Sequence, residues 1–139
     1  MRGNKAPQMT YAYGLSDEIL GTAQEIYDAW MSSAGHTAMT GGDARIDPRV
    51  GGTFTAWDRH IVGRTTALEP GHRIVQTWRT ADFAESDADS QIEVLLEPLP
   101  AGTRLRLVHT RVPDRLRGFE DGGWQAHYFD PMRADFASD

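Results

Sequence analysis

The 139-residue sequence has no cysteine, a single lysine (Lys5) and no long apolar run. Without cysteine the chain cannot form disulfides, which fits a reducing compartment. Residues 1–8 are polar and lack the apolar core of a signal peptide, and no segment is apolar over the length that a bilayer requires. We therefore expect a cytoplasmic protein without a membrane span.

The formal net charge is −6, so positive charge is also scarce. Nucleic-acid binders need clustered Lys and Arg to contact phosphates, so we expect no nucleic-acid partner. A local group of arginines does occur near the C-terminal third of the chain. Because exposed charge is the ordinary state of such residues, a solvated surface is the favoured interpretation. The group consists of Arg104, Arg106, Arg111, Arg115 and Arg117.

Sequence motifs for catalysis are missing as well. There is no G-x-S-x-G nucleophile elbow, no G-x-x-x-x-G-K phosphate loop and no G-x-G-x-x-G dinucleotide loop. The five histidines include no H-E-x-x-H pair, and the acidic stretch 82–89 lacks the spacing of a calcium loop. We expect no catalytic residue, metal site or cofactor.

The chain length fits one domain, which we place at residues 11–139 after a flexible leader of residues 1–10. A weakly alternating segment over 11–20 is a candidate strand. Thr22 followed three residues later by Glu25 is a capping box, which predicts a helix over 23–33 with Gly35 as its stop.

The middle of the sequence alternates between apolar and polar residues and is interrupted by turn residues. The period of two is typical of an antiparallel sheet with one solvated face. Turns are expected at Asp58-Arg59, at Pro70-Gly71 and over 98–102. The predicted strands cover 53–57, 60–68, 73–79, 91–97 and 104–110.

A final helix is expected from about Asp121, with Pro131 bending it locally. Its apolar stripe consists of Trp124, Tyr128, Phe129, Met132 and Phe136. Consecutive strands with helices at the two ends define an α+β protein. We predict a curved antiparallel sheet of six to seven strands, a short helix after the first strand, and a long C-terminal helix packed on the concave face.

Eight segments spread over most of the domain carry a resemblance, namely 25–30, 51–54, 61–63, 74–79, 102–105, 109–110, 112–113 and 123–129. Together they resemble the activators of the heat-shock protein 90 ATPase, specifically their C-terminal domain. The family belongs to the START-like, birch-pollen-allergen-like superfamily. The resemblance implies the helix-grip fold, and it implies a chaperone as one candidate partner. Activating members carry an additional N-terminal domain that 139 residues leave no room for, which argues against activation here.

Aromatic residues on the predicted inner faces are the candidate ligand-binding residues. Such residues either fill a core or border a pocket, and both interpretations stay open. His109 has the strand phase of Leu105 and Leu107 and is either a hydrogen-bonded core residue or a polar anchor for a ligand. By phase, Trp57 and Trp78 are expected on different faces of the sheet. The candidate pocket residues are Trp30, Phe54, Trp57, Trp78, His109, Trp124 and Tyr128.

Three functions remain open from the sequence. The first is a non-enzymatic module that binds a small apolar or amphipathic ligand between the sheet and the last helix. The second is a co-chaperone that stimulates a heat-shock protein 90 ATPase. The third is a small enzyme that uses His109. The sequence does not indicate an oligomeric state.

Overall fold

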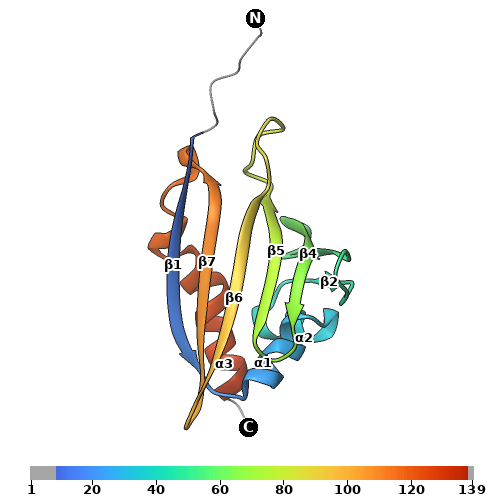
Figure 1. Ribbon diagram of the computed structural model, residues 1–139, viewed down its shortest axis with the longest axis vertical. Coiled ribbons are helices and arrows are strands. Elements are labelled where there is room, and N and C mark those ends of the chain that lie inside the picture. Colours follow the sequence, from blue (N-terminus) through green and yellow to red (C-terminus); the bar gives the residue numbers. More distant parts are fainter. Residues whose placement is uncertain (1–8, 138–139) are drawn as a thin grey trace, which may run out of the picture.

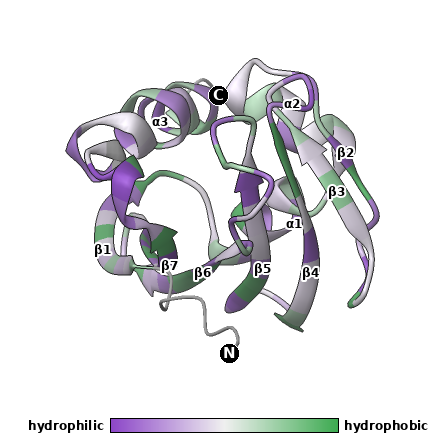
Figure 2. Ribbon diagram, turned by 90° about the horizontal axis from the view of Figure 1, so that it is seen from above, coloured by the Kyte–Doolittle hydropathy of each residue, from purple (hydrophilic) through white to green (hydrophobic). Residues whose placement is uncertain are grey.

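The computed structural model describes residues 9–137. Within them, one antiparallel sheet of seven strands has the order β1-β7-β6-β5-β4-β3-β2. Figure 1 shows the sheet face-on, and Figure 2 shows that it curves around the C-terminal helical segment. The strands are β1 (Thr10–Ile19), β2 (Arg45–Ile46), β3 (Thr53–Ala56), β4 (Ile61–Glu69), β5 (Arg73–Thr80), β6 (Ser90–Leu99) and β7 (Gly102–Pro113).

The α+β architecture predicted from the sequence is therefore confirmed, including the number and direction of the strands. The predicted leader lies mostly outside the described residues, and its last residue, Thr10, is the first residue of β1. None of the helices within residues 9–137 is long and apolar enough to cross a membrane.

Two short helices, α1 (Ala23–Trp30) and α2 (Ser33–Thr40), follow the first strand. The predicted capping box at Thr22 is present and starts α1. The sequence analysis missed α2 because it treated Gly35 as a helix stop, whereas Gly35 lies inside α2. A Cβ at Gly35 would lie 2.7 Å from the Cα of Ala29, so glycine allows α2 to pack closely on α1. Ser32 caps α2 by accepting a hydrogen bond from the Gly35 N–H.

The C-terminal helical segment starts later than predicted. A 3₁₀ turn covers Phe119–Asp121, and Gly122 has a φ of 134°, so the continuous helix begins only after it. A π-helical turn, η3 (Gln125–Phe129), leads into α3 (Asp130–Ala137). The wide turn ends just before Pro131, whose ring would clash with the preceding turn of a regular α-helix.

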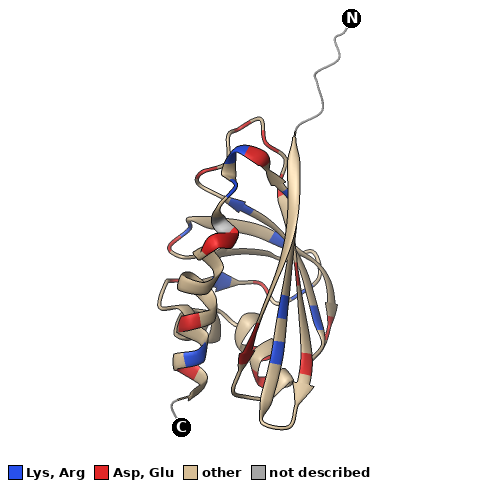
Figure 3. Ribbon diagram, turned by 90° about the vertical axis from the view of Figure 1, so that its left-hand side faces the viewer, with Lys and Arg blue, Asp and Glu red and all other residues tan. Residues whose placement is uncertain are grey.

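The core lies between the concave face of the sheet and the three helices. Figure 1 shows α3 behind β1, β7 and β6, and α1 and α2 behind the other half of the sheet. Four of the five predicted stripe residues are buried there, and Phe136 is partly buried. Charged residues of both signs lie on the sheet and on the helical segment (Figure 3). Several of them form cross-strand ion pairs, such as Arg104 with Glu18 and Glu97.

Candidate functional site

The predicted aromatic residues meet in a single cluster between the sheet and the helices. The ring centroids of Trp78 and Trp124 lie 5.0 Å apart, and those of Trp124 and Tyr128 lie 5.1 Å apart. Trp30 extends the cluster, with its ring 5.1 Å from Tyr128. All four side chains are almost completely buried. The middle of the grip is therefore filled by rings in mutual contact.

Phe54 and Trp57 lie at the β3 side of the same cluster. Phe54 is buried, with its ring 5.8 Å from that of Trp78. Trp57 follows the end of β3 and has a φ of 50°, so strand alternation does not apply to it. Its ring lies 5.4 Å from that of His127 in the C-terminal helix, on the side that Trp78 also faces. The predicted separation of Trp57 and Trp78 onto different faces of the sheet is wrong.

His109 on β7 lies within a continuous chain of hydrogen bonds. Its Nδ1 is 2.8 Å from the hydroxyl of Tyr13 on β1, and its Nε2 is 2.8 Å from Ser90 Oγ on β6. The Ser90 hydroxyl donates to the carbonyl oxygen of Trp78 at 2.6 Å. At the other end, the indole N–H of Trp124 donates to the Tyr13 hydroxyl at 2.7 Å.

The groups at the two ends of this series of hydrogen bonds determine where each proton lies. The Trp78 carbonyl can only accept, so the one proton of Ser90 points toward it, and Ser90 accepts from Nε2–H of His109. The Nδ1 atom of the neutral imidazole then accepts from the Tyr13 hydroxyl. Burial lowers the pKa of His109 to about 3, with the Glu120 carboxylate acting in the opposite direction. His109 is thus neutral and has no free lone pair, and Ser90 has no base to activate it.

A second buried histidine, His36 on α2, was not singled out by the sequence analysis. Its Nδ1 is 2.9 Å from the carbonyl oxygen of Trp30 and must carry the proton, because a carbonyl can only accept. Its Nε2 therefore accepts from the Tyr128 hydroxyl at 2.8 Å. Burial lowers the pKa of His36 to about 4. Tyr128 is also held in the neutral form, since burial raises its pKa.

A cavity of about 120 Å³ lies beside His109, near the C-terminal end of β7. Of the seven predicted pocket residues, Trp78 and His109 border it. The indole N–H of Trp78 has no hydrogen-bond partner within residues 9–137. The sequence analysis missed the other lining residues because they lie at the ends of β5 and β7 and in the loop and the turn that follow these strands. They are Thr80, Asp82, Phe83, Val112 and Leu116.

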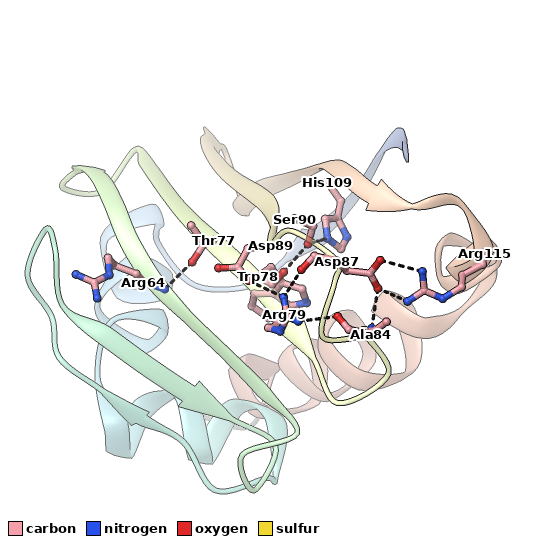
Figure 4. Close-up of polar contacts among 10 residues, drawn as sticks. All are labelled: Arg64, Thr77, Trp78, Arg79, Ala84, Asp87, Asp89, Ser90, His109 and Arg115. Atoms are coloured by element: carbon pink, nitrogen blue, oxygen red, sulfur yellow. Dashed lines mark hydrogen bonds and ion pairs between the residues drawn. The ribbon is translucent and has the colours of Figure 1, made fainter. Parts of the chain in front are cut away.

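The loop over 81–89 covers this cavity from the side of β5. Arg79, at the end of β5, donates to the carbonyl oxygens of Asp87 at 2.7 Å and of Ala84 at 2.8 Å. Asp87 pairs with Arg115, which reaches across from the turn after β7. Figure 4 shows these contacts beside Ser90 and His109. The acidic stretch thus forms an ordered loop that is held by Arg79 on one side and by Arg115 on the other.

A wider, open depression of about 560 Å³ lies at the opposite end of β7. It is formed by the turns around Gly21, Gly71 and Gly102, and it contains none of the predicted site residues. Within residues 9–137 no group of three or more His, Asp or Glu side chains is arranged to hold a metal ion. The cavity beside His109 is therefore the candidate site.

The curved antiparallel sheet closed by a C-terminal helix is the helix-grip architecture of START-like proteins. Solved structures share it. An HSP90 activator from Plasmodium falciparum superposes with a TM-score of 0.80 at 22% identity, covering 91% of this chain and 96% of that one. A Chromobacterium violaceum protein superposes with a TM-score of 0.75 at 25% identity, covering 93% and 99%.

The model of the family described as "Activator of Hsp90 ATPase homolog 1-like protein" matches residues 21–136, and the chain belongs to this family. The resemblance inferred from the sequence is confirmed. A Dictyostelium discoideum protein named "Activator of 90 kDa heat shock protein ATPase homolog" is 27% identical over 128 residues, which cover 88% of this chain. The chain spans about a third of the length of the curated relatives that it matches.

Proposed function

We propose that the protein is a non-enzymatic module that binds a small apolar molecule in the cavity beside His109. The observation that carries this proposal is the cavity itself, which has apolar walls from Trp78, Phe83, Val112 and Leu116. Ligand sites are typically concave and apolar with a few fixed polar groups. Here the polar side chains that line the cavity are Thr80, Asp82 and His109, and His109 is held in place by Tyr13 and Ser90.

The volume of the cavity favours a ligand the size of one aromatic ring. Dry cavities of about 150 Å³ lined by apolar side chains hold benzene, and this cavity measures about 120 Å³. Thr80 and Asp82 also line the cavity, which favours a ligand that carries one hydroxyl oxygen besides its ring. Phenol combines a single ring with such an oxygen and is a suitable probe.

The neutral, fully engaged His109 supports binding without catalysis. A general base needs a free lone pair on a group whose pKa lies near the working pH. In His109 the lone pair of Nδ1 accepts from Tyr13, and burial lowers the pKa to about 3. The enzyme hypothesis therefore has less support than the binding hypothesis.

Calorimetric titration with phenol tests this function. A ligand of seven heavy atoms is expected to bind with a Kd of roughly 1 mM, so phenol is added to about 10 mM. The variant Leu116→Trp should fill the cavity and abolish binding. Leu99→Trp, a half-buried leucine at the other end of the sheet, is the matched control and should bind like the wild type. Absence of phenol binding by the wild type, or unchanged binding by Leu116→Trp, would refute the proposal.

A co-chaperone role is the second candidate, favoured by membership of the family and by the curated relative from Dictyostelium. The partner would be a heat-shock protein 90 homologue. The test is the ATP hydrolysis rate of that chaperone with and without this protein. An increase that saturates with added protein supports the role, and an unchanged rate at saturating protein removes it.

A further inference from the structure

Asp87 fixes the loop over 81–89. Of the nine residues in this loop it is the buried one, with a side chain that is 4% exposed, while Phe83 is half-buried and the others are exposed. The carboxylate accepts from the Ala84 N–H at 2.6 Å within the loop. It also accepts two hydrogen bonds from the guanidinium group of Arg115, one of them at 2.9 Å. The loop is therefore held by polar contacts and has little apolar burial of its own.

The ion pair joins two segments that each supply part of the wall of the cavity. Asp82 and Phe83 line it from the loop, while Leu116 lines it from the 3₁₀ turn η1 (Asp114–Leu116). Arg115 belongs to η1 and extends to Asp87, so the pair ties one segment to the other (Figure 4). The contacts of Arg79 do not bridge these segments, because they join β5 to the loop that follows it.

We propose that the ion pair between Asp87 and Arg115 sets the size of ligand that the cavity accepts. The inference rests on the proposed binding function and deepens it. With the pair formed, the cavity has room for one ring. When the pair is broken, the loop over 81–89 separates from η1 and a two-ring ligand fits between Phe83 and Leu116.

The charges of the pair persist at neutral pH. The hydrogen bonds from Arg115 hold the pKa of Asp87 at about 2, well below its usual range, with smaller contributions from the Ala84 N–H and from Arg79. Bidentate pairs of arginine with carboxylate are among the stronger and more directional polar contacts. The same geometry makes lysine a poor substitute, because its ammonium group cannot bind both oxygens in a fixed fork.

The test compares phenol with 1-naphthol, a two-ring analogue with the same hydroxyl group. Both are titrated calorimetrically into the wild type, Arg115→Gln and Arg115→Lys. Asp114→Asn is the matched control, since Asp114 lies in the same turn but pairs with Arg117. We expect Arg115→Gln to bind 1-naphthol about tenfold more tightly than the wild type, with phenol affinity changed less than about threefold. Arg115→Lys should be intermediate, and Asp114→Asn should match the wild type.

The test distinguishes failure of the proposed size limit from failure of the proposed binding function. If phenol binds but the affinity for 1-naphthol is the same in the wild type and in Arg115→Gln, the size limit is refuted and the binding function stands. If phenol binds to none of the proteins, the binding function and the size limit both fall. Hydrogen exchange shows whether the variant is still folded. In Arg115→Gln, amide exchange should be faster within 81–89 and unchanged in the strands. Unchanged exchange in that loop would also refute the proposal.

Discussion

Two buried histidines should make the fold less stable as the pH falls below about 6.5. An unfolded histidine has a pKa of about 6.5, whereas burial lowers the pKa of His36 to about 4 and that of His109 to about 3. Between these values the unfolded chain binds more protons than the folded chain. The free energy of unfolding therefore decreases as the pH drops through this window and is unaffected by these groups above it.

The size of the effect follows from the width of the window. At pH 5 an unfolded histidine is almost fully protonated and the two buried ones are still neutral. Each then lowers the free energy of unfolding by about 2 kcal/mol relative to pH 8, since one pH unit corresponds to about 1.4 kcal/mol. Together they amount to about 4 kcal/mol, a large part of the roughly 5–15 kcal/mol typical of a domain.

Urea unfolding at pH 7.5 and pH 5.0 measures this difference in the wild type, His36→Gln and His109→Gln. Each substitution should cost some stability at pH 7.5 through its lost hydrogen bonds. Each should also reduce the difference between the two pH values by about 2 kcal/mol. The exposed His72 provides the control, because His72→Gln should keep the wild-type difference. A full wild-type difference in His109→Gln would refute the assignment of a buried neutral imidazole.

Two further predictions concern the local geometry. Nitrogen-15 NMR of the imidazoles should show opposite neutral tautomers, with the proton on Nε2 in His109 and on Nδ1 in His36; the same tautomer in both would contradict the hydrogen-bond directions. Gly63→Ala should destabilise the protein by about 3 kcal/mol in urea unfolding, because an added Cβ would clash with the backbone carbonyl oxygen of Thr77 on β5 and lie 2.6 Å from the ring of Phe54. A cost below about 1 kcal/mol would show that β4 can shift away from Thr77 on β5 and from Phe54 on β3.

The strands were predictable because their signals are local. Alternation of apolar and polar residues identified β6 and β7, and Pro70-Gly71 marked the turn between β4 and β5. The failures came from residues whose role depends on a distant neighbour. Gly35 ends a helix in many sequences, but here it lies where α2 packs on Ala29. The local signal that was missed is Ser32, a good N-cap residue that starts α2 just before Gly35.

The site was predictable in part for the same reason. The phase of His109 on its strand indicated an inward side chain, and the structure places it there. Its partners Tyr13 and Ser90 were missed, because they become neighbours only when β1 and β6 pair with β7 on either side. The alternation of Tyr11 and Tyr13 in the first strand was a usable signal, since it gives these two residues one common face.

The location of the cavity follows from how the aromatic side chains are distributed between the sheet and the helices. The sequence indicates which aromatic side chains face the concave side of the sheet. Whether space is left between them depends on whether neighbouring elements bring their rings into contact. Around Trp124 they do, because Trp30, Trp78 and Tyr128 come from separate elements and their rings pack together. Beyond His109 the wall is completed by residues at the ends of β5 and β7 and in the loop and the turn that follow them. The space that remains is therefore bounded by segments held through an ion pair, and for this reason its size can respond to a single side chain such as Arg115.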